Sequence, residues 1–149
     1  MKIKRLGLES VDSIYEIEQK AQISPWSRES IADVFNYSYY TVLGAYDGAE
    51  HLCGFIIFDE VAGESNLHDI AVAPSYQNKG IGSILLSSYL DMLKLHGISR
   101  SILEVRVSND PARHLYGKFN YTEIAIRKNY YKTKGPHKED AVIMENILL

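Results

Sequence analysis

The chain has 149 residues, of which 46% are hydrophobic, with a formal net charge of −3 and one cysteine. This length and apolar content suit one globular domain, which we expect over residues 1–149. The negative charge argues against direct nucleic-acid binding, because such affinity comes mainly from Lys and Arg neutralising phosphates. Cys53 has no partner for an internal disulfide, and no run approaches the ~18 apolar residues of a membrane span. The composition therefore predicts a cytoplasmic protein without a membrane partner.

The first half of the sequence predicts a short strand, two helices and three further strands. Apolar residues recur at helical spacing from Val11 to Ala21, and Ser24-Pro25 ends that helix. Ser27 can cap a second short helix that contains Ile31, Val34 and Phe35. Strands are expected over Thr41 to Tyr46, Leu52 to Phe58 and Gly63 to Val72, and Asp47-Gly48 turns the first two into a hairpin.

The second half alternates helices and strands. The longest helix is expected from Gly80 to His96 with Gly97 as its stop, and Pro111 marks the first turn of another from Asp110 to Lys118. Strands are expected over Ser101 to Val107, Tyr121 to Lys128 and Ala141 to Leu148. This order predicts an α/β fold with a mixed sheet of about seven strands flanked by about four helices.

Two glycines, Gly80 and Gly82, lie where a strand passes into the longest helix. Without Cβ atoms they let backbone amides approach a bulky anion, and the unpaired N–H groups of a helix N-terminus favour a diphosphate. The preceding Lys79 adds positive charge. Tight packing of a strand on a helix also uses glycines of this kind, so the residues alone leave both interpretations open.

The spacing Gln77-x-x-Gly80-x-Gly82 resembles the Q/R-x-x-G-x-G/A signature of the GNAT superfamily of N-acetyltransferases, in which it cradles the coenzyme A pyrophosphate. A closer resemblance, to bacterial ribosomal-protein-alanine N-acetyltransferases of the RimI type, extends over nearly the whole chain. It is carried by Tyr15-x-Ile17-Glu18-Gln19, Pro25-Trp26-Ser27, His68-Asp69-Ile70-Ala71-Val72, Leu103-Glu104-Val105-Arg106, Ser108-Asn109, Leu115-Tyr116, Arg127-Lys128-Asn129-Tyr130-Tyr131 and Glu139 to Met144. The resemblance implies a single GNAT-type domain that uses acetyl-CoA as cosubstrate, without a metal.

The resemblance also implies the coenzyme contacts. Ile70, Ala71 and Val72 would offer backbone groups to the acetyl and pantetheine portion. Asn109 would touch the pantetheine arm, although Asn at this position is also an ordinary helix cap. The pyrophosphate would bind at Gln77, Asn78, Lys79, Gly80, Ile81 and Gly82.

Two residues are candidates for proton transfer. Glu104 lies in an apolar strand where an unpaired carboxylate is costly to bury, so it faces either solvent or a cleft, and in a cleft it suits a general base. For Tyr116 the resemblance implies a hydroxyl that protonates the departing thiolate, with a core tyrosine as the alternative. A phenol with a pKa near 10 keeps its proton at neutral pH, which suits that role.

Three aromatic residues are weaker candidates for the acceptor site. Trp26 lies between the first two helices, and Tyr130 and Tyr131 are expected on the loop before the last strand. Each either lines an amine or peptide site or simply packs. The five histidines show no metal-site spacing, and His68 alone lies beside the expected site. Asn120, where the family often has Gly, still tolerates a left-handed helix stop, whereas Gly117 is unfavourable inside a helix.

The sequence therefore predicts direct acetyl transfer within a ternary complex, with backbone amides near Ile70 to Val72 stabilising the oxyanion. The resemblance implies an acceptor that is a protein N-terminus, the alanine of a ribosomal protein. A small-molecule amine or an internal lysine is the nearest alternative, because the coenzyme motif says nothing about the acceptor. A non-catalytic coenzyme A-binding module is the alternative from another class.

Overall fold

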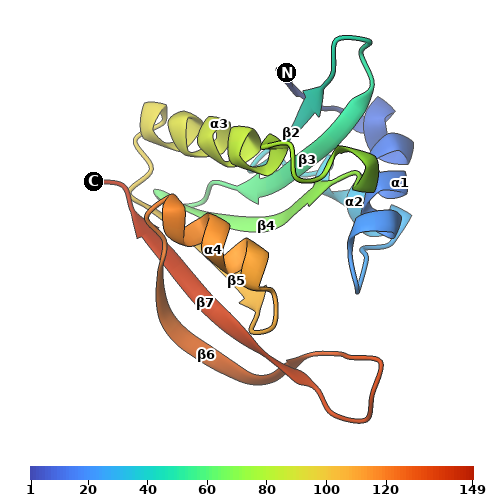
Figure 1. The fold of residues 1–149 in the computed structure, drawn as a ribbon. Helices are drawn as coiled ribbons and strands as arrows, with labels where there is room; N and C mark the ends of the chain where they lie inside the picture. The colour runs from blue at the N-terminus through green and yellow to red at the C-terminus, as the bar shows by residue number, and fades with distance from the viewer.

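The computed structural model describes residues 1–149, and its central feature is a seven-stranded mixed sheet (Figure 1). The strands are β1 (Lys2–Arg5), β2 (Tyr40–Tyr46), β3 (Leu52–Asp59), β4 (Glu64–Val72), β5 (Arg100–Arg106), β6 (Thr122–Tyr131) and β7 (Glu139–Ile147). They lie in the order β1-β2-β3-β4-β5-β7-β6. Only β4 and β5 are parallel neighbours; every other pair is antiparallel.

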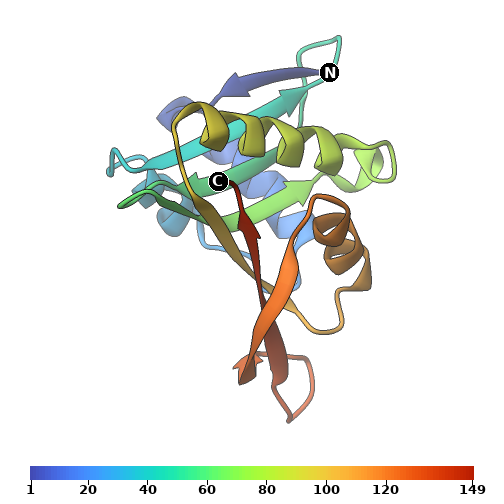
Figure 2. The same ribbon diagram turned by 90° about the vertical axis from the view of Figure 1, so that its left-hand side faces the viewer.

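Four α-helices cover the two faces of the sheet, which confirms the predicted fold class (Figure 2). On one face, α1 (Val11–Ala21) and α2 (Arg28–Val34) bury Ile14 and Ile31 against β3. On the other face, α3 (Ile81–Leu95) and α4 (Asp110–Lys118) pack on a larger apolar core. Two short 3₁₀ turns, Leu8–Ser10 and Pro74–Tyr76, were not predicted. No helix is long and apolar enough to cross a membrane.

The predicted helix ends are confirmed by their backbone geometry. The hydroxyl of Ser27 accepts the Ser30 amide at 3.1 Å and so caps α2. Gly97, after α3, and Asn120, after α4, both adopt left-handed backbone with φ of 72°. Asn120 therefore provides the helix stop that glycine often provides, as expected for a residue whose short polar side chain tolerates this region.

Strand β4 contains a β-bulge at His68 that changes which face the later side chains of the strand reach. Asp69 lies opposite Ile57, and Leu67 lies opposite Phe58, so His68 is an extra residue without a partner on β3. Because side chains alternate along a strand, the extra residue reverses which face the following side chains reach. Leu67 belongs to the core beneath α3, whereas Ala71 belongs to the core beneath α1 and α2.

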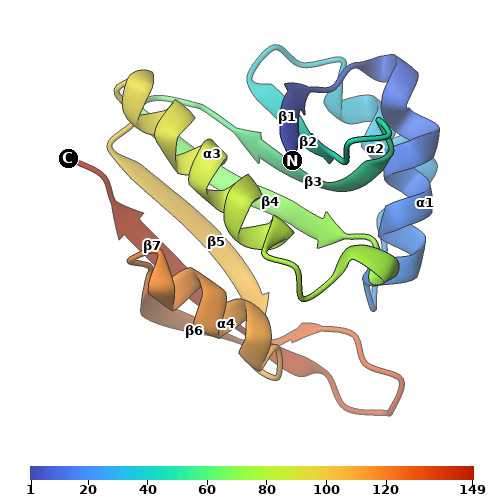
Figure 3. The ribbon, with the colours of Figure 1, turned by 45° about the horizontal axis from the view of Figure 1, so that its top comes forward.

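The parallel pairing of β4 with β5 ends at Leu67, directly before the bulge. Residues Glu64 to Leu67 pair with Arg100 to Leu103, and no pairing continues beyond them. The two strands then diverge, with α3 over β4 and α4 over β5 (Figure 3). The edge of β4 that faces β5 is thus without a partner strand from the bulge to Val72, and we call it the open edge.

One predicted boundary was wrong. The sixth strand was expected to end at Lys128, and Tyr130 and Tyr131 were expected on the following loop, but β6 continues to Tyr131, which pairs with Glu139. The register shifts between Arg127 and Tyr131, and Asn129 has a positive φ of 52° there. A left-handed Asn signals a turn in sequence, whereas here it forms a bulge within the strand.

Candidate active site

The open edge of β4 presents backbone groups of known direction. The amide of Ala73 donates to the Cys53 carbonyl on β3 at 2.8 Å. Because residues of an antiparallel pair alternately face and avoid the neighbouring strand, Ala71 bonds to β3 while Ile70 and Val72 direct their N–H and C=O groups toward the open edge. Of the three backbone positions predicted to contact the coenzyme, two are therefore available, and the alternation assigns Ala71 to the sheet.

Two side-chain amides occupy the carbonyls of this edge. Gln22, the residue after α1, donates its Nε2 to the Ile70 carbonyl at 3.0 Å, and Gln77 donates its Nε2 to the Val72 carbonyl at 3.1 Å. The N–H groups of Ile70 and Val72 remain as donors of the edge, and the Ile70 N–H also lowers the pKa of the preceding Asp69. Such donors suit a carbonyl oxygen that gains negative charge during acyl transfer.

The N-terminus of α3 lies at the end of the same edge. Gly80 is its cap, with φ of 80°, and Asn78 before it is also left-handed, with φ of 61°. The first intrahelical bond comes from Ile84 to the Gly80 carbonyl, so the amides of Ile81 and Gly82 have no partner within the helix. This arrangement can bind a diphosphate, as the sequence predicts for Gln77 to Gly82.

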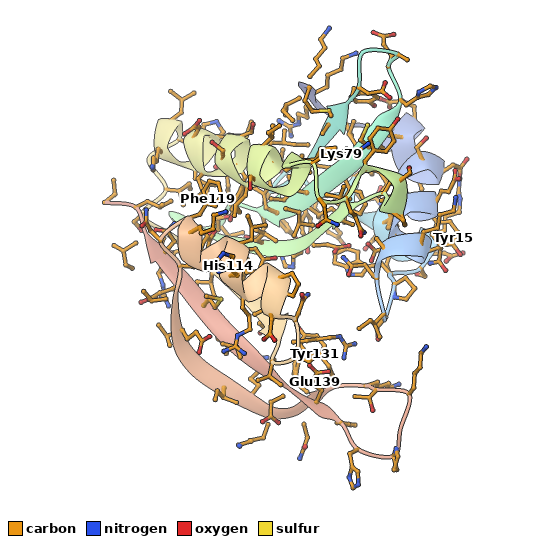
Figure 4. The ribbon with its side chains drawn as sticks, in the orientation of Figure 1. Tyr15, Lys79, His114, Phe119, Tyr131 and Glu139 are labelled. Atoms are coloured by element: carbon orange, nitrogen blue, oxygen red, sulfur yellow. The ribbon has the colours of Figure 1, made fainter.

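The loop that leads into α3 is bound to the turn between β2 and β3. The hydroxyl of Tyr76 donates to Asp47 Oδ2 at 2.6 Å, and this bond lowers the pKa of Asp47 to about 2. Lys79 Nζ lies 5.5 Å from the centroid of the Tyr76 ring (Figure 4). The cation of Lys79 is thereby kept at the loop, next to the amides that would bind phosphate.

The sequence left open whether Glu104 on β5 faces solvent or a cleft, and in the structure its side chain is partly exposed. Its side chain is 28% exposed and forms an ion pair with Arg127, whose Nη1 is 3.3 Å from Glu104 Oε1. A hydrogen bond to Glu104 is also the main reason why the pKa of Tyr130 is raised. Glu104 is thus a solvent-accessible carboxylate with a cation and a phenol beside it, which suits a group that takes up a proton from an incoming amine.

Tyr116 on α4 is a buried tyrosine that belongs to the core beneath α3 and α4. It is 5% exposed, and its ring packs against Tyr121 with centroids 5.7 Å apart. Burial raises its pKa above the ordinary value, and the charges of Asp69 and Tyr131 add to the effect. Its proton is therefore retained at neutral pH, as a donor to a departing thiolate requires.

Tyr131 links these two residues electrostatically. Burial, followed by the charge of Glu104, raises the pKa of Tyr131 to about 12, and Tyr131 in turn acts on Tyr116. Figure 4 shows Tyr131 close to Glu139, where β6 passes toward β7. The predicted base and the predicted acid are therefore each coupled by charge to one predicted acceptor-site aromatic, Tyr131.

Among the other predicted residues, Tyr130 is exposed, whereas Trp26 and Asn109 make contacts that support the fold. Tyr130 is 46% exposed and packs edge-to-face on Tyr131 at 5.0 Å, so it is available to an acceptor. Trp26 packs partly buried on the α1–α2 core, and Asn109 Oδ1 accepts the Ala112 amide at 3.3 Å as a helix cap. His68 Nε2 lies 2.7 Å from Asp59 Oδ2. No group of three or more His, Cys, Asp or Glu residues could hold a metal ion.

Sequence reasoning assigned no role to Arg106, although it lies in one of the quoted motifs. Its guanidinium donates to Ser24 Oγ and to the Lys132 carbonyl, both at 2.9 Å, and stacks on the Tyr131 ring at 4.5 Å. Arg106 therefore ties the loop after α1 to the β6–β7 hairpin beside Glu104. No sequence pattern joins Ser24 to Arg106, because the two residues are 82 positions apart.

Two hollows of the surface lie elsewhere. One, of about 350 Å³, lies between the end of α2 and β2, and the other, of about 460 Å³, lies between α3 and the chain after α4. None of the predicted site residues lines either of them. The open edge is instead a gap in strand pairing, which an extended ligand can fill by hydrogen-bonding along the strand.

The sheet opens beside a glycine-capped helix, and this arrangement suits an enzyme that uses a phosphate-bearing donor. The model of the acetyltransferase (GNAT) family matches residues 11–121, and the chain belongs to this family. Members of this family take the acetyl group from acetyl-CoA, and the protein is an N-acetyltransferase.

The similar proteins are close in sequence and in structure. The ribosomal protein bS18-alanine N-acetyltransferase of Escherichia coli K12 is 38% identical over 140 residues, which cover 93% of each chain. The enzyme of that name from Haemophilus influenzae is 38% identical over 133 residues, or 89% of each chain. The crystal structure of the Escherichia coli ribosomal-protein-S18-alanine N-acetyltransferase superposes with a TM-score of 0.93 at 35% identity, covering 99% of this chain and 93% of that one.

Proposed function

We propose that this enzyme acetylates the N-terminal α-amine of ribosomal protein bS18, at an alanine. The observation that carries the proposal is the match, over 93% of both chains, to the Escherichia coli enzyme whose name states this substrate. The relation spans the coenzyme site and also the segments that flank Glu104, where an acceptor would enter.

The residues of this chain take the following parts. The amides at the start of α3 bind the pyrophosphate of acetyl-CoA, and the N–H groups of Ile70 and Val72 face the acetyl carbonyl. Glu104 accepts a proton from the amine as it attacks, directly or through water. Tyr116 donates its proton to the sulfur as the C–S bond breaks, so that coenzyme A leaves as a neutral thiol.

An α-amine suits this arrangement better than a lysine does. The α-amino group has an ordinary pKa of about 7.7–8.0, against about 10.4 for lysine, so far more of it is the free base at neutral pH. A carboxylate paired with Arg127 is a modest base, and it suffices for an amine that is already largely unprotonated.

Two matched peptides test the proposal. One carries a free N-terminal alanine and the following residues of bS18 without lysine, and the other has a blocked N-terminus and one internal lysine. Mass spectrometry after incubation with acetyl-CoA should find acetyl only on the free α-amine. Preferential acetylation of the blocked peptide would contradict the proposal, and acetylation of neither peptide would shift the assignment to a small amine.

A further inference from the structure

Two carboxyl groups lie buried together behind the open edge, and the transfer chemistry described above uses neither of them. Glu18 on α1 is fully buried, and Asp69 on β4 is 8% exposed. Glu18 Oε2 accepts the Trp26 amide at 3.0 Å, and Asp69 Oδ1 accepts Gln22 Nε2 at 2.8 Å. Glu18 Oε1 and Asp69 Oδ2 are buried and have no hydrogen-bond partner, and Glu18 is the neighbouring carboxyl that, after burial, raises the pKa of Asp69.

This pairing requires a proton. Two ionised carboxylates in contact and out of water repel each other, whereas one carboxylic acid and one carboxylate form a strong hydrogen bond. Burial and the adjacent Glu18 raise the pKa of Asp69 to about 9, and the Gln22 and Ile70 N–H groups oppose the effect only in part. At neutral pH the pair therefore holds one proton and one negative charge, and this proton can join Glu18 Oε1 to Asp69 Oδ2, the two oxygens that have no other partner.

The pair is connected to the acetyl-transfer site through the Gln22 side chain and through the backbone, since Asp69 directly precedes Ile70. Gln22 Nε2 donates both to Asp69 Oδ1 and to the carbonyl of Ile70, at 2.8 and 3.0 Å. Ile70 is the residue whose N–H faces the thioester at the open edge. An amide nitrogen with both protons committed in this way fixes the orientation of the Ile70 peptide relative to α1.

We infer that Glu18, Asp69 and Gln22 are positioning residues for acetyl transfer: the carboxyl pair shares one proton, orients the Gln22 amide, and thereby holds the Ile70 peptide toward the thioester. The inference rests on the acetyltransferase activity of the family and does not depend on which amine is the acceptor. On this inference, Glu18 on α1 and Gln22 after it hold β4 in place beyond the bulge, where β5 no longer pairs with β4.

Replacing either carboxyl group with an amide tests whether the Glu18–Asp69 pair holds one shared proton, no proton or two protons. In Glu18→Gln the new NH₂ donates to Asp69 and the new oxygen still accepts from Trp26. In Asp69→Asn the new NH₂ donates to Glu18 and the new oxygen still accepts from Gln22. Each single variant thus replaces the shared proton with a permanent donor and keeps every bond.

The double variant cannot keep them all. The Gln oxygen must face Trp26, so its NH₂ faces the Asn oxygen, and the Asn NH₂ then faces the NH₂ of Gln22. That donor–donor contact forces Gln22 to turn away from Asn or to lose its bond to Ile70. We expect each single variant to melt within about 3 °C of the parent, and the double variant to melt at least about 5 °C lower than the sum of the two single changes, since neighbours in one network are non-additive.

The pH dependence of stability gives a second readout. The folded pKa of Asp69 is raised above its unfolded value, so the parent loses stability as pH rises from about 4 to about 9, and both single variants should lose less over that interval. Opposite Asp69, β3 presents the uncharged Ile57, and α1 presents Glu18. Tyr116 on α4 is the other titratable group that senses Asp69, and its raised pKa keeps it protonated in this range.

The positioning role is tested by Gln22→Met, with Gln19→Met as the matched control. Gln19 follows Glu18 on the same helix, but its amide bonds to the Trp26 carbonyl and not to β4. Gln22→Met should lower kcat by roughly 10-fold or more, because small misplacements at a reacting centre have effects of that size. It should leave the acetyl-CoA thermal shift within experimental error of the parent, and Gln19→Met should leave both unchanged.

Three results would overturn the inference. Additive melting temperatures in the double variant would exclude the shared proton, and so would single variants that both lose more than the stated 3 °C. An unchanged kcat in Gln22→Met would exclude the positioning role. If the double variant fails to fold while both single variants fold, the non-additivity is established and Gln22→Met still decides the role in catalysis.

Discussion

The two glycines at the start of α3 should respond to alanine with opposite effects on stability and different effects on coenzyme binding. Gly80 has φ of 80°, and an alanine there costs about 1–2 kcal/mol because its Cβ disfavours left-handed backbone. Gly82 is helical, and a Cβ there would lie 3.5 Å from Leu115 Cδ2, an ordinary contact. Gly82→Ala should therefore stabilise the fold by about 0.5–1 kcal/mol.

For a chain of this length, about 1 kcal/mol shifts the melting temperature by about 2–4 °C, so the two variants should move in opposite directions by measurable amounts. Acetyl-CoA at about 100 times its dissociation constant should raise the stability of the parent by about 2.7 kcal/mol. Gly80→Ala should lose most of that shift, because its Cβ would enter the open space where the phosphates would bind, whereas Gly82→Ala should keep it, since the signature accepts Ala at this position.

Gly117→Ala is the matched control. Gly117 lies in α4, and an added Cβ there meets no atom within 4 Å, so the substitution should stabilise by a similar amount and leave the acetyl-CoA shift intact. Differential scanning fluorimetry with and without acetyl-CoA measures all three variants. A full ligand shift in Gly80→Ala would refute the placement of the pyrophosphate.

Two further substitution experiments address the acceptor side. Glu104→Gln and Tyr116→Phe should each lower kcat by roughly 10²-fold while the acetyl-CoA thermal shift persists, because both side chains act on protons and not on the pyrophosphate; parental kinetics in both variants would eliminate this mechanism. Arg106→Met releases both the loop after α1 and the β6–β7 hairpin, so the KM for the acceptor peptide should rise by about 10-fold or more with little change in acetyl-CoA binding. A parental KM for the peptide would show that this tie does not shape the acceptor site.

Most of the fold could be predicted from the sequence because its signals are local. The helical spacing from Val11 to Ala21, the serine cap of α2 and the glycine stop after α3 each depend on residues a few positions apart. The bulge of β4 could not be predicted in the same way. His68 interrupts an otherwise regular strand, and only the partner strand shows that it has no opposite residue.

The same distinction applies to the candidate site. Apart from Asn109, the residues predicted for the coenzyme lie between Ile70 and Gly82, so the resemblance of one short stretch predicted them together, and the strand register then separated Ala71 from Ile70 and Val72. The residues around Glu104 come from β5, β6 and the loop after α1. Alternation along β5 left open whether Glu104 faces solvent or a cleft, and its contacts with Arg127 and Tyr130 are long-range and invisible to local pattern.

The hydrogen-bonding polarity of the open edge follows from these long-range contacts. An unpaired strand edge ordinarily presents donors and acceptors in equal number and can pair with any other strand. Here the side chains of Gln22 and Gln77 bond to the Ile70 and Val72 carbonyls, so the exposed edge presents donors. An edge of donors is a poor template for another strand, and it is well suited to the carbonyls of an acetyl-pantetheine arm. The bulge and the two glutamines thus leave a sheet edge that presents N–H groups, and such groups suit a carbonyl oxygen that gains negative charge.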